Sequence, residues 1–358
     1  MTRPAAVHID LSAIRHNYRI AKALAPTARA VAVIKANAYG HGAVAVARAL
    51  EPDADAFAVA CIEEALELRE SGITRPILLL EGVFEPDELT LVERTQLTPV
   101  IHSQVQMDWL LQARPSRPLD VWLKMDTGMH RIGLAPADFA AAHTALSACP
   151  HVGGIVSMTH LARADELDSG ATTRQLQCFQ DHAGPFATLR SLANSAAVLA
   201  WPAAHGDWIR PGIMLYGATP LSGPHPSSAG LRPTMSLESA LISVRELAAG
   251  EPIGYGGRFV CDRPTRVGVV AMGYADGYPR HAPDGTPVAV KDRLSRIIGR
   301  VSMDMLTVDL SDIPHPRIGD PVQLWGDQVA ANDVAAASGT IAYQLFTGVS
   351  RRIPLRYA

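Results

Sequence analysis

The stretch AVAVIKANAYGHG, residues 30–42, joins an apolar run to a polar turn and decides the fold. Its first half, rich in alanine and valine, is typical of a strand that is buried on both faces. Lys35 follows this run directly. Burial of an ammonium group is costly unless the charge is paired or its pKa falls, so a lysine at this place indicates chemistry. A lysine that reaches solvent from a strand end is the alternative.

Further apolar runs follow the first and alternate with segments of helical composition. The runs are AFAVAC (56–61), PILLL (76–80), TPVI (98–101), DVWLKMD (120–126), VGGIVSM (152–158), LRSLA (189–193) and DWIRPGIMLYG (207–217). Segments such as IEEALELRESG (62–72), bounded by glycine or proline, suit the helices between them. Strands that alternate with helices in this way predict an α/β fold, a (β/α)8 barrel of the TIM type.

The texture of the sequence changes after TPLSGPHPSSAG, residues 219–230, which has the composition of a linker or exposed loop. Short β-like runs such as MSLESALISVREL (235–247) and TPVAVKD (286–292) then follow, separated by turn residues, with one short helix expected at NDVAAAS (332–338). We therefore expect a barrel over residues 1–225 and a smaller, mostly β domain over residues 226–358.

Composition favours small-molecule chemistry. The formal charge is −3 and no runs of like charge occur, so the sequence does not indicate a basic surface that would bind nucleic acid or an anionic membrane. No window approaches the roughly 20 apolar residues that span a bilayer, and the amino terminus lacks an apolar signal core. The four scattered cysteines have no metal-ligand spacing, so they are interpreted as free thiols in the cytoplasm and no metal is expected.

Polar residues follow several predicted strands at their carboxyl ends, which is where active sites of barrels of this class gather. They are Lys35, Lys124, Asp126, Arg131, His160, Asn194, Ser195 and Arg210, together with the backbone of Gly212 and Ile213. The last two strands of such barrels often supply a phosphate site. A lysine that faces such a site fits pyridoxal 5'-phosphate (PLP), an aldehyde that forms a Schiff base with an amine. Taken by itself, however, Ser195 is more typical of an ordinary helix cap.

Nine motifs in register along nearly the whole chain resemble those of the bacterial alanine racemase family. They are AVIKANAYGHG, KMDTGMHRIGL, SMTHLARAD, ANSAA, IRPGIMLYG, IGYGGRF, MGYADGYPR, GRVSMDM and DPVQLWG. The resemblance implies interconversion of L-alanine and D-alanine on PLP by a homodimer with shared active sites. The product would supply peptidoglycan precursors, or the enzyme would serve alanine catabolism.

The resemblance also implies how the cofactor is held. Lys35 would carry PLP as a Schiff base, and His160 would lie near the ring beside Arg210, which would face the pyridine nitrogen. A guanidinium cannot accept the ring proton, so this nitrogen would stay unprotonated and the ring would be a weaker electron sink, which favours racemisation. The groups that would grip the phosphate are Tyr39, Ser195, Tyr343 and the amides of Gly212 and Ile213.

Racemisation needs a proton removed from one face of Cα and returned on the other, hence two acid–base groups. The resemblance assigns Lys35 to D-alanine and Tyr255, donated by the second subunit, to L-alanine. Arg131 would hydrogen-bond this tyrosine and the substrate carboxylate, with a backbone contact from Met303 of the partner subunit. The remaining implied roles are Tyr274 and Asp304 at the entrance, and Lys124 as a possible carbamylated lysine. His41 receives no role.

Three other interpretations are weighed. A PLP-dependent decarboxylase with the same barrel would have other second-domain motifs, and a binding protein made of the barrel alone would lack the second domain. A metal-dependent hydrolase would carry an H-x-H motif at the end of the first strand, where this chain has KANAYGHG. The terminal stretch TGVSRRIPLRYA (347–358) departs from the usual pattern of the family. We expect this departure to affect the packing of the terminus more than the chemistry.

Overall fold

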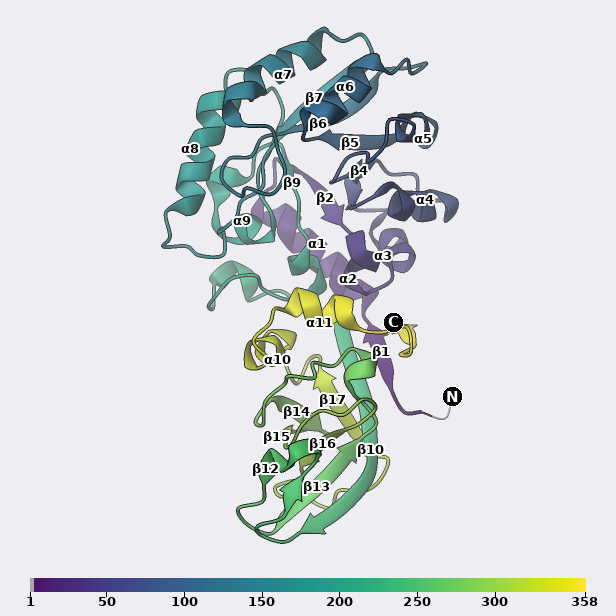
Figure 1. The fold of residues 1–358 in the computed structure, drawn as a ribbon, viewed down its shortest axis with the longest axis vertical. Helices are drawn as coiled ribbons and strands as arrows, with labels where there is room; N and C mark the ends of the chain where they lie inside the picture. Colours follow the sequence, from purple (N-terminus) through teal and green to yellow (C-terminus); the bar gives the residue numbers. More distant parts are fainter. Residues whose placement is uncertain (1–2) are drawn as a thin grey trace.

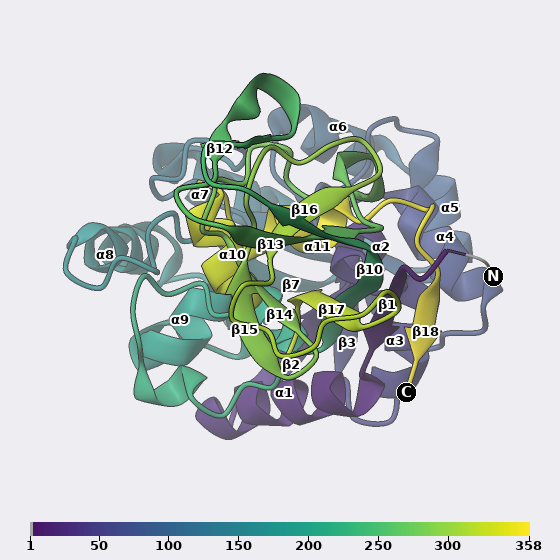
Figure 2. The same ribbon diagram turned by 90° about the horizontal axis from the view of Figure 1, so that it is seen from below.

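The computed structural model describes residues 3–358, which form two lobes along one long axis (Figure 1). Parallel strands surrounded by helices make up one lobe, and a mostly antiparallel β structure makes up the other. Viewed along this axis, the strands of the second lobe lie across one end of the first (Figure 2). This arrangement confirms the predicted α/β barrel followed by a mostly β domain.

The barrel is one eight-stranded sheet in the order β8-β7-β6-β5-β4-β3-β2-β9, with all neighbours parallel. The strands are β2 (Arg29–Val33), β3 (Ala56–Val59), β4 (Ile77–Leu79), β5 (Leu97–Ile101), β6 (Leu119–Lys124), β7 (Val152–Met158), β8 (Arg190–Ser191) and β9 (Trp208–Ile209). The helices are α1 (Leu11–Leu24), α2 (Lys35–Tyr39), α3 (Ala43–Leu50), α4 (Ile62–Glu70), α5 (Glu88–Arg94), α6 (Gln104–Gln112), α7 (Pro136–Ala148), α8 (Ala171–Ala183) and α9 (Ser195–Ala200), with 3-10 turns at Pro202–Ala204 and Ile213–Tyr216. Each strand is followed by at least one helical segment, as the sequence predicted.

The barrel closes between its shortest strands, β8 and β9. The amide of Asp207 donates to the carbonyl oxygen of Arg190 at 2.9 Å, and the Ser191 hydroxyl donates to the carbonyl oxygen of Trp208 at 2.9 Å. The eighth predicted strand, residues 207–217, is much shorter than expected. β9 ends at Ile209, and Pro211, which has no N–H to give to a ladder, lies between this strand and the 3-10 turn at Ile213–Tyr216.

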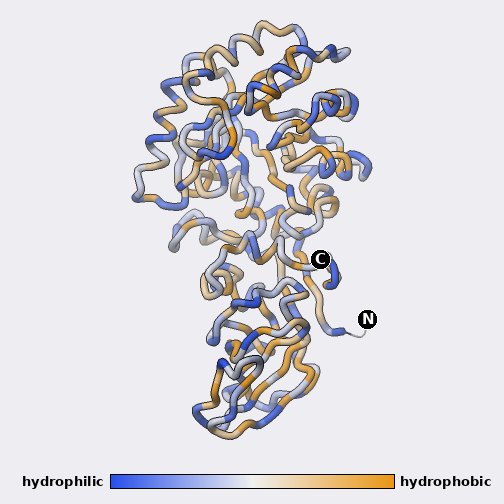
Figure 3. The backbone as a smooth tube through the Cα atoms, viewed as in Figure 1, coloured by the Kyte–Doolittle hydropathy of each residue, from blue (hydrophilic) through white to orange (hydrophobic). Residues whose placement is uncertain are grey.

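Hydrophobic residues line the central strands of both lobes, while the outer helices carry the hydrophilic ones (Figure 3). In β2, the four residues Ala30 to Val33 are all buried, as expected for a strand enclosed on both faces. The helix α1 begins at a capped turn in which the Asp10 carboxylate accepts a hydrogen bond from the amide of Ala13 at 2.9 Å. The hydrophobic periodicity of the sequence therefore predicts the core correctly.

The second lobe is built on one sheet with the strand path β15-β14-β17-β10-β1-β18, to which β13 is added beside β10 and β16 beside β13. Its strands are β1 (Ala6–Ile9), β10 (Met235–Leu247), β13 (Thr265–Val270), β14 (Pro287–Val290), β15 (Arg293–Arg296), β16 (Leu306–Asp309), β17 (Pro321–Trp325) and β18 (Leu355–Tyr357), with a separate hairpin of β11 (Pro252–Ile253) and β12 (Phe259–Val260). The remaining helical segments are α10 (Ala331–Ala337), α11 (Ala342–Gly348) and 3-10 turns at Pro226–Ser228, Tyr255–Gly257 and Tyr274–Asp276. The helix expected at residues 332–338 corresponds to α10.

One strand lies outside the lobe to which the sequence assigned it. We expected residues 1–225 to form the barrel, but β1 pairs antiparallel with β10 and parallel with β18, so it belongs to the second sheet. A four-residue strand carries no local signal for its pairing partner, because that choice depends on long-range contacts.

Among residues 3–358, no helix is long and apolar enough to cross a membrane. The four cysteines are unpaired, as predicted.

Candidate active site

Lys35 lies just after β2, at the start of a left-handed turn. The four residues from Ala36 to Tyr39 have φ between 52° and 54°, a conformation that costs an L-residue about 1–2 kcal/mol. Hydrogen bonds hold the turn: the amide of Ala43 donates to Oδ1 of Asn37 at 2.8 Å, and the amide of Gly42 donates to the carbonyl oxygen of the same residue at 3.0 Å. Strain of this kind persists where the surroundings fix the chain, and such places are often functional.

A cavity of about 510 Å³ opens at the carboxyl ends of the barrel strands and receives Lys35. Its lining contains eleven of the residues that the sequence singled out, namely Lys35, Tyr39, Lys124, Arg131, His160, Asn194, Ser195, Arg210, Gly212, Ile213 and Tyr343. Tyr343 comes from α11, which packs against α2 between the two lobes (Figure 1). The chain thus brings these widely spaced residues to one place.

Arg210 is fixed deep in the cavity wall, with 3% of its surface exposed. Its guanidinium donates to Oγ of Ser191 at 2.6 Å and to the carbonyl oxygen of Thr159 at 2.7 Å. Burial lowers the pKa of Arg210 to about 10, so the side chain stays charged at neutral pH. Nδ1 of His160 lies 3.5 Å from this guanidinium. The cavity therefore holds a rigid cation that offers hydrogen-bond donors only.

Most of the charged side chains that line the cavity are cationic, and their charges lower the pKa of two bases, Lys124 and His160. Burial, followed by the charges of Arg210 and Arg131, lowers the pKa of Lys124 from 10.5 to about 7. Burial and the same cations hold the pKa of His160 well below its usual value, so its ring is neutral. A cavity with this field favours an anionic ligand.

A small polar cradle lies between Tyr39, Ser195 and Gly212. The Gly212 amide donates to Oγ of Ser195 at 2.8 Å. A Cβ atom at position 212 would stand 2.7 Å from the Tyr39 hydroxyl and 3.8 Å from Oγ of Ser195, so only glycine leaves this space open. Burial raises the pKa of Tyr39 to about 12 and raises that of Tyr343 too, so both phenols keep their protons as donors. Such a set of donors suits a phosphate group.

Arg131 reaches the cavity from an ordered loop. The carboxylate of Asp126 accepts hydrogen bonds from the amides of Gly128 and Met129 at 2.9 and 3.0 Å, which folds the loop back. The amide of Leu134 then donates to the carbonyl oxygen of Lys124 at 2.9 Å and returns the chain to the barrel. Asp126, one of the polar residues at the strand ends, is thus a loop anchor.

Tyr255, Tyr274, Met303 and Asp304 do not line the cavity of their own chain. They lie on the second lobe, where Tyr255 is 69% exposed and Met303 is 54% exposed. Tyr274 and Met303 belong to adjoining turns, because the amide of Tyr274 donates to the carbonyl oxygen of Ser302 at 3.0 Å. The structure therefore brings Tyr274 and Met303 of this second group together, and none of the four residues lines the cavity that holds Lys35 of the same chain.

The atypical carboxyl-terminal stretch contacts this second group. Arg352 forms an ion pair with Asp304 at 2.6 Å and lies 3.6 Å from a carboxylate oxygen of Asp276. Asp276 is fully buried and also pairs with Arg3 at 2.6 Å. Changes at the carboxyl terminus thus bear on the turn that carries Tyr274, in addition to terminal packing.

Besides the apolar Val33, Ile132 and Met158, the sequence analysis did not single out four lining residues: Leu80, Glu81, Phe84 and His102. They follow β4 and β5 as Lys35 follows β2, and Nε2 of His102 lies 3.0 Å from the carbonyl oxygen of Glu81. The signal that found the others, polar residues just after a predicted strand, would have found Glu81 and His102 as well.

Comparison with known proteins gives the chain a family. Residues 9–220 match the family model "Alanine racemase, N-terminal domain", and residues 234–357 match "Alanine racemase, C-terminal domain". An alanine racemase of Pseudomonas syringae is 56% identical over 356 residues, which cover 99% of each chain. A catabolic alanine racemase of Pseudomonas putida is 57% identical over 355 residues, again 99% of each.

Solved structures agree with these matches. The crystal structure of the biosynthetic alanine racemase from Pseudomonas aeruginosa is 52% identical in sequence, covers 100% of both chains and has a TM-score of 0.97. Both family models and relatives more than half identical over their full length lead to one conclusion: the chain belongs to the alanine racemase family.

Proposed function

We propose that this protein interconverts L-alanine and D-alanine with PLP as its cofactor, as a homodimer located in the cytoplasm. The observation that carries the proposal is the cavity at the barrel mouth, where Lys35, the Tyr39–Ser195–Gly212 cradle and Arg210 lie together. Membership of the alanine racemase family supports the same reaction.

When bound, PLP would supply an aldehyde for the amine of the substrate and a conjugated ring that makes the Cα hydrogen acidic. Lys35 is the cavity amine that follows β2, and it would hold the cofactor between turnovers and move a proton at Cα on one face. The hydroxyls of Tyr39, Ser195 and Tyr343 and the amides of Gly212 and Ile213 would hold the phosphate.

Arg210 would determine the reaction type. It stays charged and has no lone pair to accept a proton, and its bonds to Ser191 and Thr159 fix its direction. Opposite a group that only donates, a ring nitrogen accepts a hydrogen bond and stays unprotonated. A weaker electron sink favours rapid reprotonation at Cα, and hence racemisation over slower alternatives.

The second base would be Tyr255 of the partner subunit. In one chain, Tyr255 is 69% exposed and lies outside the cavity, which fits a residue that acts across a dimer interface. Arg131 at the cavity rim would hold the substrate carboxylate and stabilise the phenolate form of this tyrosine. Met303 would add a backbone contact from the partner, and Tyr274 and Asp304 would narrow the entrance.

The direct test measures deuterium exchange at Cα, starting from each enantiomer of alanine with purified protein and PLP. We expect both enantiomers to exchange and to racemise. Exchange without racemisation, or no exchange at all, would contradict the proposal. Because the two enantiomers have equal free energy, one catalyst serves both directions. Consumption of the product therefore determines whether the enzyme supplies D-alanine for peptidoglycan or serves alanine catabolism.

Replacing Gly212 with alanine should weaken PLP binding about tenfold or more, since overpacking a tight site costs about 1–3 kcal/mol. The new methyl group would stand 2.7 Å from the Tyr39 hydroxyl and occupy the cradle. Equilibrium dialysis with PLP measures the effect. Gly223→Ala is the control, because nothing lies within 4 Å of a Cβ atom there. Equal affinities of the two variants would count against the cradle as the phosphate site.

Lys124 should be carbamylated when bicarbonate is present. Only a neutral amine reacts with carbon dioxide, and a pKa of about 7 makes Lys124 largely neutral above that pH and protonated below it. Carbon-13 NMR with labelled bicarbonate should show a carbamate signal at about pH 8 that weakens below about pH 7. The signal should vanish in Lys124→Arg and persist in Lys291→Arg, whose parent lysine is a surface residue paired with Asp320. A signal that survives Lys124→Arg would assign the modification elsewhere.

A further inference from the structure

The loop Gly40–His41–Gly42 lies where the barrel meets the second lobe, and its histidine has no part in the proposed chemistry. We propose that His41 is a positioning residue, which holds Tyr39 and helix α11 in the arrangement that grips the cofactor phosphate. The proposal rests on the proposed function and adds a residue to the phosphate site that no part of the mechanism uses directly.

The first observation is a pair of hydrogen bonds from a fully buried ring. Nδ1 of His41 lies 2.9 Å from the carbonyl oxygen of Tyr39, and Nε2 lies 2.8 Å from the Thr234 hydroxyl. Thr234 immediately precedes β10, the first strand after the linker. One side chain therefore ties the end of the left-handed turn to the start of the second lobe.

The ring protons can be placed from these contacts. Burial lowers the pKa of His41 to about 4, so the ring is neutral and carries one N–H. A carbonyl oxygen can only accept, which places this hydrogen on Nδ1, facing Tyr39. Nε2 then accepts from the Thr234 hydroxyl. The carbonyl oxygen of Tyr216 lies 2.9 Å from the same hydroxyl and competes for its single hydrogen. Loss of the Thr234 hydroxyl would leave a buried nitrogen without its donor.

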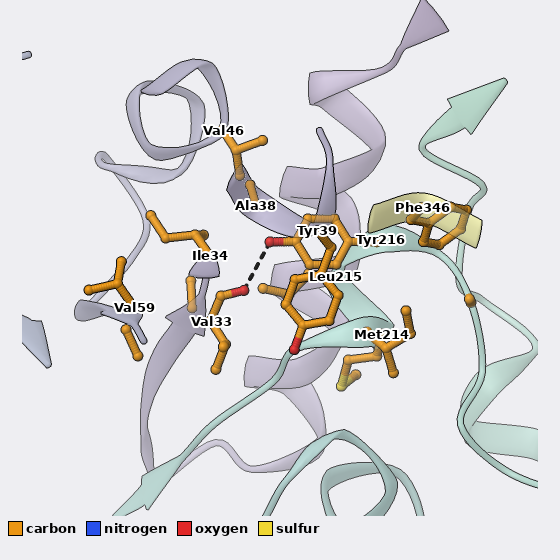
Figure 4. Close-up of a cluster of buried hydrophobic side chains, with 14 of the residues drawn as sticks. Val33, Ile34, Ala38, Tyr39, Val46, Val59, Met214, Leu215, Tyr216 and Phe346 are labelled. Atoms are coloured by element: carbon orange, nitrogen blue, oxygen red, sulfur yellow. Dashed lines mark hydrogen bonds between the residues drawn. The ribbon is translucent and has the colours of Figure 1, made fainter. Parts of the chain in front are cut away.

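Aromatic packing extends this hold to both tyrosines of the phosphate site. The His41 ring lies 4.6 Å from the Tyr216 ring, which stacks on Tyr39 at 4.7 Å between centroids. The edge of the His41 ring also meets Phe346 of α11 at 5.2 Å, and Tyr343 of the same helix lies 5.8 Å from Tyr39. Figure 4 shows Tyr39, Tyr216 and Phe346 in one cluster, with Tyr216 hydrogen-bonded to Val33 of β2.

The flanking glycines show that the loop has no room for a side chain on either side of His41. A Cβ atom at Gly40 (φ 78°) would lie 2.2 Å from the carbonyl oxygen of Phe346, and one at Gly42 (φ 91°) would lie 2.0 Å from the Tyr357 hydroxyl. The backbone thus touches the carboxyl-terminal segment on both sides of His41. The left-handed turn before it is strained, so its position depends on contacts such as the bond from His41 to Tyr39.

The experiment compares binding of PLP with binding of pyridoxal, which lacks the phosphate. Full-length wild type, His41→Leu, His41→Asn and Thr234→Val are tested by equilibrium dialysis. Thr286→Val is the matched control, because Thr286 is also a buried threonine of the second lobe with a bonded hydroxyl.

We expect the Kd for PLP to rise about tenfold in His41→Leu and a few fold in Thr234→Val, with pyridoxal unaffected. His41→Asn, which can still donate to the Tyr39 carbonyl oxygen, should recover part of the loss, and Thr286→Val should match wild type. Equal weakening for PLP and pyridoxal would reduce His41 to a structural residue and overturn the proposal. Unchanged PLP binding in a folded variant would overturn it too. If His41→Leu fails to fold, the affinity of Thr234→Val for PLP decides the question. A wild type that does not bind PLP would overturn the proposed function as well.

Discussion

Replacing Lys35 with alanine should abolish racemisation, with a fall in kcat of about 10⁴-fold or more, because this residue carries two functions in the proposed mechanism. The amine would be lost both as the covalent anchor of PLP and as the base on one face of Cα. Lys35 lies just after β2 and lines the cavity together with Tyr39. Lys291→Ala, at a surface ion pair with Asp320, should retain full activity.

Borohydride reduction tests the same residue without mutation. Reduction of the PLP-loaded protein should fix the cofactor on one peptide, and mapping should find it on Lys35. The other cavity lysine, Lys124, is buried and is the informative competitor, because its pKa of about 7 also makes it a reactive amine. Label on Lys124 instead would remove the central assignment.

Replacing Tyr255 with phenylalanine should lower L-to-D turnover by roughly 10²–10⁴-fold, the range expected for loss of a general base. Exchange of the Cα hydrogen of D-alanine should survive in part, because Lys35 would still abstract from that face. The measurement is solvent deuterium incorporation from each enantiomer separately. Near-normal turnover of L-alanine, or equal losses for both enantiomers, would argue against a two-base scheme.

Mixing the two inactive variants tests whether the active site is shared. In a dimer of Lys35→Ala with Tyr255→Phe, one site would lack both bases and the other would be intact. Random exchange of subunits in an equal mixture should therefore restore about a quarter of wild-type activity. This recovery requires Tyr255 to act in the partner's cavity, in agreement with its 69% exposure and its distance from the cavity lining of its own chain. A mixture that stays inactive would place both bases in one chain.

The sequence by itself determined the barrel, the second domain and most of the cavity lining. The inferences about the barrel and its cavity lining rest on local information: apolar runs of strand length, helical segments between them, and polar residues just after the runs. Because parallel strands of a barrel end at one rim, a list of strand ends is already a list of neighbours. This is why Lys35, Lys124, His160 and Arg210 could be grouped before any coordinates were known.

Only the tertiary structure decided the features that depend on groups far apart in the chain. β1 joins the second sheet through pairing with β10 and β18, and the left-handed turn after Lys35 is stabilised by its surroundings against its own backbone preference. The lowered pKa of Lys124 requires burial together with the charge of Arg210, which comes from the far end of the barrel sequence, and that of Arg131 on the loop after β6. The contact of His41 with Thr234 joins residues 193 positions apart. Hydrophobic periodicity reports which face of an element is buried, whereas pairing, strain and electrostatic fields arise only once distant segments have met.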